Sequence, residues 1–176
     1  MRMRRLLLAT AAGLLTLTIA SPAWADSGVS TATVTVTTGS LLISVPTDAG
    51  NLGTRANTVL GGTISGTLGQ VQVSDARGAA AGSGWVTSVI SSAFTPPTGT
   101  AIAASAVSYT AGTITKVGTA TYTADDPVAL TGVSAAVTAT GITGDNSATW
   151  NPTIHVAVPG GMAAAIYSAT ITHSVV

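Results

Sequence analysis

The sequence predicts an all-β protein, built as a single antiparallel β-sandwich of the Ig-like, Greek-key type. Apolar and polar residues alternate with a period of two over many short segments, which is typical of strands with one buried face. Thr and Val dominate these segments, and their branching at Cβ suits a pleated surface. Gly, Pro, Asp and Asn separate the segments at short intervals. Many short strands with such turn residues between them indicate a sandwich.

The first 25 residues have the pattern of a secretory signal peptide. Arg2, Arg4 and Arg5 precede an apolar run, and a small-residue cleavage site, Ala-Trp-Ala, follows at 23–25. Arg4-Arg5 lacks the rest of the twin-arginine consensus, which favours the general secretory route. We therefore expect 1–25 to be a cleaved signal helix and 26–176 to be one secreted domain.

Composition narrows the function of the expected mature chain. It keeps three cations, Arg55, Arg77 and Lys116, against six aspartates, which gives a formal charge of −3. So few cations cannot form the basic stripe on which nucleic-acid binding depends. The chain has no Cys, and we expect neither a lipid nor a sortase-type anchor, nor a membrane span after signal cleavage. The neutral, hydroxyl-rich strand faces fit an extracellular protein among polysaccharides.

Ten segments carry the strand pattern. In the first, 30–38, Ala32, Val34 and Val36 share one face and threonines occupy the other, which predicts a half-buried strand. Between Leu68 and Val71 the alternation changes phase, which predicts a bulge or turn at Gly69. The other expected strands are 40–46, 58–68, 70–75, 84–90, 105–110, 116–123, 129–140, 149–159 and 167–176, with turns at 46–50, 75–84, 96–99, 125–127, 144–146 and 159–161.

The sequence offers little for catalysis, and we expect no enzyme activity and no cofactor. The chain has neither Glu nor Cys, and the Gly-x-Ser-x-Gly motif is absent. His155 falls opposite the apolar face of its strand, toward solvent. Asp125 and Asp126, with Asp145 and Asn146, have the oxygen ligands of a calcium site, but Asp-Asp-Pro is also an ordinary turn, and we favour the turn. Asp75 and Arg77 are expected to form a surface ion pair in a polar bend.

Trp85 has two interpretations, a plug in the core or an exposed platform for a sugar. In 84–90 both Trp85/Val89 and Val86/Ile90 are apolar, so we expect a central strand covered on both sides. Few other large side chains are available to fill a core made of Ala, Val, Ile and Leu, which favours the plug. On the last strand His173 shares a face with Tyr167, and a buried imidazole there needs a hydrogen-bond partner.

Several stretches in order along the chain resemble the WxL domain, a cell-surface module of Gram-positive bacteria. They are "VQVSDARGAAAGSGWVTSV", "SAFT", "ASAVSYT" and "TWNPTIHVAVPGGMAAAIYSATITHSV", and the resemblance runs from about Leu41 to Val176. Both defining Trp-x-Leu motifs are degenerate. The first reads Trp85-Val86-Thr87, and His173 stands where the second has its indole.

The resemblance implies a non-catalytic protein of the cell surface that associates non-covalently with peptidoglycan or an associated wall polymer. We take Trp85, Trp150, Tyr167 and His173 as its candidate binding residues. Members of the family often occur beside partner surface proteins. The alternative is therefore a structural or interaction subunit that packs on such partners through an exposed strand or an apolar patch, without glycan binding.

Overall fold

The computed structural model describes residues 32–37 and 39–176. The chain divides into two units, Met1–Thr35 and Val36–Val176. Every strand of the described residues belongs to the second unit, and the expected signal helix at 1–25 lies outside those residues. Among the helices of the described part of the chain, none is long and apolar enough to cross a membrane.

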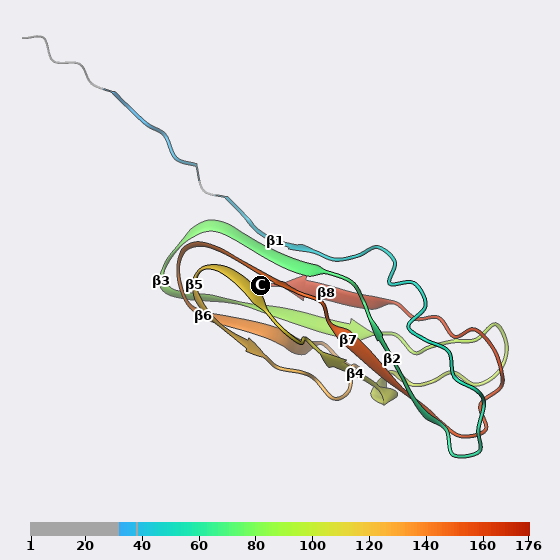
Figure 1. Cartoon of the computed structure of the whole chain (residues 1–176). Helices are drawn as coiled ribbons and strands as arrows, with labels where there is room; N and C mark the ends of the chain where they lie inside the picture. The colour runs from blue at the N-terminus through green and yellow to red at the C-terminus, as the bar shows by residue number, and fades with distance from the viewer. Residues whose placement is uncertain (1–31, 38) are drawn as a thin grey trace, which may run out of the picture. The chain divides into compact units, whose positions relative to one another are not determined.

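The all-β sandwich is confirmed, and every strand pairing is antiparallel (Figure 1). A larger sheet has the order β1-β3-β6-β5, with β8 also pairing β3, and a smaller sheet has the order β2-β7-β4. Apart from β5 and β6, strands that are neighbours in a sheet are not neighbours in the sequence, as expected of Greek-key connections. The elements are β1 (Leu41–Ser44), β2 (Gly62–Thr67), β3 (Val71–Ser91), a 3₁₀ turn η1 (Ala104–Ala106), β4 (Val107–Thr110), β5 (Thr115–Ala124), β6 (Ser134–Trp150), β7 (Thr153–Val158) and β8 (Ile171–Val175).

Two predicted turns, 75–84 and 144–146, are wrong as strand boundaries, because β3 and β6 run through them as bent strands. Their ladder continues across register shifts between Asp75 and Ala79 and again between Ala79 and Ser83. Gly78 takes a φ of +61° at the bend, a conformation that Gly adopts without a Cβ clash. Figure 1 shows β3 doubling back on itself. Both arms belong to the larger sheet, which therefore folds over into two layers, one with each arm of β3.

The core lies between these layers. Trp85, on the second arm of β3, pairs with Ala139 of β6, which pairs with Tyr122 of β5. The small Ala139 lets the two rings approach, with their centroids 5.6 Å apart. The largest fully buried side chains are Trp85, Trp150, Tyr109, Leu130, Ile142 and Ile154.

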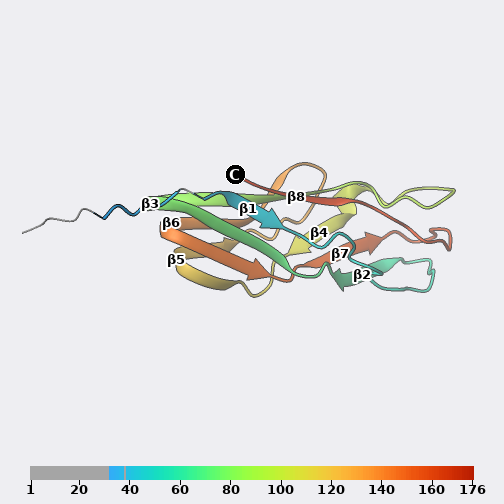
Figure 2. The same cartoon turned by 90° about the horizontal axis from the view of Figure 1, so that it is seen from above.

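The expected strand 149–159 is interrupted. β6 ends at Trp150 and β7 begins at Thr153, in the other sheet. Pro152 lies between them, and because proline has no N–H it cannot continue a ladder. The break transfers the chain from one sheet to the other. Beyond the smaller sheet the loops before β2 and after β7 gather at one end of this unit (Figure 2).

The prediction of a strand at 30–38 is wrong for residues 32–37, which the structure describes. Residues 32–37 belong to no strand, and all are exposed. Val34 and Val36 are 85% and 89% exposed, although the sequence places them on an apolar face.

Candidate functional site

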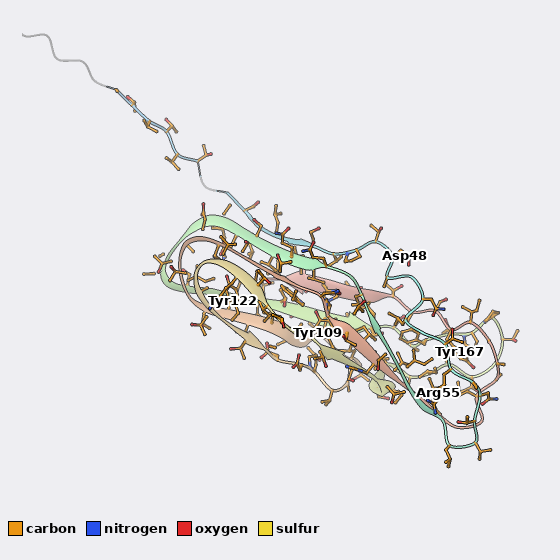
Figure 3. The ribbon with its side chains drawn as sticks, viewed as in Figure 1. Asp48, Arg55, Tyr109, Tyr122 and Tyr167 are labelled. Atoms are coloured by element: carbon orange, nitrogen blue, oxygen red, sulfur yellow. The ribbon has the colours of Figure 1, made fainter. Side chains whose placement is uncertain are left out.

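A cleft of about 940 Å³ opens where the loops at 45–58 and 159–170 extend beyond the smaller sheet. We call it the loop cleft. Figure 3 shows Asp48, Arg55 and Tyr167, all from its lining, at this end of the unit. Buried apolar side chains form its floor, and hydroxyl and amide side chains of the loops surround them. The floor residues are Leu68, Phe94, Ile102 and Val156.

Short-range hydrogen bonds shape the first loop. The Asp48 carboxylate accepts from the Gly50 N–H at 2.8 Å, and the Asn51 amide oxygen accepts from the Gly53 N–H at 2.9 Å. Both are turns in which an Asp or Asn side chain binds the backbone two residues on. These contacts give the loop a defined course without a strand or helix.

The two loops are also tied to each other. The Gly161 N–H of the second loop donates to the Thr58 carbonyl of the first at 3.1 Å, and within the first loop Arg55 Nη2 donates to the Gly61 carbonyl at 2.6 Å. Gly61 has a φ of +68°, and a Cβ there would overlap the Val158 carbonyl. A glycine is therefore required where the first loop meets the second.

His173 lines the loop cleft and is connected to the core behind it. The Trp150 Nε1–H donates to the Tyr109 hydroxyl at 2.7 Å, and that hydroxyl lies 3.4 Å from His173 Nε2. Burial raises the pKa of Tyr109 and lowers the pKa of His173 to about 4. At neutral pH the phenol therefore keeps its proton and the imidazole is neutral, and the tautomer of the imidazole decides which of the two groups donates. The imidazole thus has the hydrogen-bond partner that its burial requires.

Two of the four candidate binding residues line the cleft, and two do not. Tyr167 and His173 are part of its wall, and the Tyr167 hydroxyl donates to the Ala163 carbonyl of the same loop at 2.9 Å. Trp85 and Trp150 are each 2% exposed, so neither indole has a face free for stacking. Their assignment as binding residues is corrected: Trp85 is a core plug, and Trp150 is connected to the cleft only through Tyr109 and His173.

Trp85 belongs instead to a buried polar network far along the strand from the cleft. Its Nε1–H and the Tyr122 hydroxyl both donate to Asn146 Oδ1, each at 3.1 Å. The Asn146 amide donates to Asp75 Oδ2 at 3.2 Å. Arg77 closes the network with two hydrogen bonds to the Asp75 carboxylate, at 2.8 and 2.9 Å.

The prediction of a surface ion pair between Asp75 and Arg77 is right about the pairing and wrong about the surface position of Asp75. Asp75 and Arg77 do pair, but the Asp75 side chain is fully buried while that of Arg77 is 38% exposed. The hydrogen bond from Arg77 lowers the pKa of Asp75, against the opposing effect of burial. The pair anchors the bend of β3 to the core, which a surface pair would not do.

The carboxylates of the calcium alternative serve separate backbone and side-chain contacts. Asp125 accepts from the Thr138 hydroxyl at 2.8 Å, Asp126 from the Ala111 N–H at 2.7 Å, and Asp145 from the Gly78 N–H at 2.9 Å. Within residues 32–37 and 39–176, no three His, Cys, Asp or Glu side chains are grouped as a metal site requires. Neither the Asp125 nor the Asp126 contact is the bond to the backbone two residues on that the turn interpretation predicts.

His155 makes the only contact that resembles part of a catalytic arrangement in the described chain. Its Nδ1 lies 2.8 Å from Ser65 Oγ, and its Nε2 lies 3.3 Å from Thr110 Oγ1. A nucleophilic serine also needs a third group that orients the base, and in triads this is a carboxylate. Here a threonine hydroxyl occupies the place of that carboxylate. The row Ser65–His155–Thr110 is a set of side-chain hydrogen bonds that joins the three strands of the smaller sheet.

Sequence reasoning missed the loop cleft as a site. The available signal was local: an Asp or Asn precedes a glycine by two residues at Asp48 and Asn51, and a second glycine-rich segment follows at 160–161. Neither segment alone indicates that the two loops face each other. No family model, curated protein or solved structure matches this chain.

Proposed function

We propose that this protein is a secreted, non-catalytic cell-surface protein that associates non-covalently with bacterial peptidoglycan through the loop cleft. The observation that carries the proposal is the cleft itself. Its volume of about 940 Å³ lies at the upper end of the range for ligand pockets, roughly 300–1,000 Å³. The resemblance to the WxL domain and the signal-like N-terminus supply the extracellular setting.

The lining matches the chemistry of an N-acetylated glycan. Asn51, Asn57 and Thr54 offer amides and hydroxyls, which both donate and accept hydrogen bonds. Peptidoglycan carries N-acetyl groups, hydroxyls and short peptides, which need such partners. The apolar floor suits acetyl and alanyl methyl groups. Asp48 and Arg55 bring one charge of each sign, so the cleft has no strong preference for an ionic polymer.

The test fills the cleft without removing any contact. Ala56 is exposed and lines the cleft, so Ala56→Trp should obstruct it, whereas Ala135→Trp adds the same ring at an exposed position of β6 outside it. We expect the exported protein to sediment with purified sacculi. Ala56→Trp should weaken this binding by about tenfold, or ~1.4 kcal/mol, while Ala135→Trp leaves it unchanged. The measurement is the bound fraction against sacculus concentration.

The possible outcomes distinguish two questions: whether the protein binds peptidoglycan, and whether the loop cleft is the binding site. Denaturant should release the bound protein without hydrolysis of the wall, because the association is non-covalent. If both variants bind as the parent does, the cleft is not the site. If the parent stays entirely in the supernatant, peptidoglycan association itself is refuted.

A second candidate function, a subunit that packs on partner surface proteins, is favoured by apolar side chains on the same loops. Val59, Leu60 and Ile166 are 91%, 95% and 81% exposed. Exposed apolar groups that cluster often mark interaction surfaces. Capture of partner proteins from a surface extract, compared with capture of sacculi, distinguishes the two functions. If the Leu60→Ser variant no longer captures partner proteins but still binds sacculi, the surface around Leu60 is a site for partner proteins.

A further inference from the structure

The N-terminal segment 32–37 has the pattern of a strand but no strand partner among the residues that the structure describes. Ala32, Val34 and Val36 alternate with three threonines, yet the segment belongs to neither sheet. Exposure of two valines at 85% and 89% leaves apolar surface in water that pairing in a sheet would bury. Six residues in strand conformation extend about 20 Å, the length of an ordinary strand.

The fold in turn leaves one long strand edge open. β5 has ten residues and pairs only with β6, so its outer edge presents unpaired N–H and C=O groups. Eight of its residues are exposed, and only Ala120 and Tyr122 are half-buried. Within the described residues, no backbone hydrogen bond reaches this outer edge.

The other edges are shorter or covered. A Cβ on Gly66 of β2 would overlap the backbone of Leu52, so the loop before β2 lies against that strand. The Pro127 carbonyl accepts from Tyr109 of β4, and the Leu130 N–H donates back to β4. β1 and β8 have four and five residues. The outer edge of β5 is thus the longest one available for an added strand.

We propose that the segment 32–37 of one molecule adds as a strand to the outer edge of β5 in a second copy of this chain. The side chains of the two match. On β5 the half-buried Ala120 and Tyr122 face the core, and Val34 and Val36 would cover the open side of Tyr122. On the other face, the threonines of the segment would extend the row formed by Thr121 with Thr140 and by Thr123 with Thr138.

A second copy is required because the segment cannot reach its own β5. The segment precedes β1 by only residues 38–40, and β1 pairs with the first arm of β3. The regular half of β5, Thr121–Ala124, is separated from β1 by β3 and β6 and follows the second arm of β3 in the opposite layer. Three strand spacings of about 4.8 Å, together with about 10 Å between layers, exceed the reach of the linking residues.

The contact is heterologous, since a donor segment meets a different surface on the acceptor. Such contacts form rings or open filaments, because each acceptor keeps its own free segment. Backbone hydrogen bonds would supply the affinity, and the alternating side chains would fix the register between the segment and β5, as in other cases of strand addition. Lys116 lies at the start of β5 and is exposed. A lysine on an edge opposes pairing, which favours addition at the 119–124 end.

The test measures self-association of the exported protein in solution, without cell wall. We expect the mean mass from sedimentation velocity to rise with concentration. The double variant V34T/V36T keeps β-branching but removes the apolar face, and should weaken association by at least about tenfold. The matched control T33V/T35V changes the opposite face by the same groups, and should associate at least as well as the parent.

Hydrogen exchange locates the acceptor. Those amides of Thr121–Ala124 that point to the outer edge should become at least about tenfold better protected on association, while the amides of β2 and β4 keep their exchange rates. A protein that stays monomeric, equal loss in both double variants, or protection at another edge would each overturn the proposal. The wall-binding function is tested separately: V34T/V36T should still sediment with sacculi, and Ala56→Trp should still self-associate.

Discussion

At the scale of single residues, Trp85 combines apolar packing with a polar contact in the core. Its ring packs at 5.6 Å from the ring of Tyr122, and its Nε1–H is paired with Asn146. A buried indole N–H needs such a partner, and the amide oxygen receives two donors in return. The residue therefore fills volume and completes the network that includes Asp75.

Substitution of Trp85 should separate these two contributions. Trp85→Ala should lower the free energy of unfolding by about 3–5 kcal/mol, because a large cavity forms in the core. Trp85→Phe keeps most of the apolar volume and loses the hydrogen bond, which costs about 1–2 kcal/mol. Urea denaturation with a fixed m-value measures both changes. An unchanged midpoint for Trp85→Ala would contradict the core assignment.

His173 should make stability depend on pH in the mildly acidic range. Its folded pKa of about 4 lies below the ordinary value of about 6.5, so the unfolded chain binds more protons between these limits. The free energy of unfolding should therefore fall as pH is lowered from about 6.5 to 4, by roughly 3 kcal/mol at most. The lowered pKa of Asp75 acts at lower pH, below its ordinary value of 3.8.

The control for this pH dependence replaces the titrating group. His173→Gln keeps a hydrogen-bond partner for the Tyr109 hydroxyl but has no titrating group, so the slope of the unfolding free energy between pH 6.5 and 4 should flatten relative to the parent. Thermal or urea unfolding across this range provides the measurement, and a slope that survives in His173→Gln would assign it to another group.

At the scale of elements, the bent pair β3 and β6 depends on local repairs of its ladder. Thr87 is buried at a register shift between the two strands. Its hydroxyl donates to the Val137 carbonyl at 3.1 Å and accepts from the Val137 N–H at 3.0 Å. The side chain thus replaces ladder bonds that the bulge removes.

Thr87→Val tests this repair with an isosteric side chain. Both backbone groups of Val137 lose their partner in a buried place, which should cost about 2–4 kcal/mol of unfolding free energy. Thr140→Val makes the same change at an exposed position of β6 and should change the free energy of unfolding by less than about 0.5 kcal/mol. Chemical denaturation compares the two, and equal effects would show that the hydroxyl of Thr87 has no special role.

Elements also show why some strand predictions hold and others do not. Period-two alternation placed Trp85 and Val89 correctly on a buried face, because alternation follows from the geometry of any single strand. Val86 and Ile90, expected to be covered as well, are half-buried. The same alternation at 32–37 predicted a strand that lacks a partner. A strand needs a neighbour, and no local pattern contains one.

At the scale of the whole molecule, the sequence alone determined the all-β class, the two-faced strands and the apolar core, because these follow from local periodicity and composition. Tertiary structure decided what the turn-like residues at 75–84 do, since bulges let β3 bend without leaving its ladder. It also brought Asn146 to both Trp85 and Asp75, and the loops at 45–58 and 159–170 to one cleft. These contacts join residues about 60 to 110 positions apart, whose meeting depends on register and on the folding of one layer over the other.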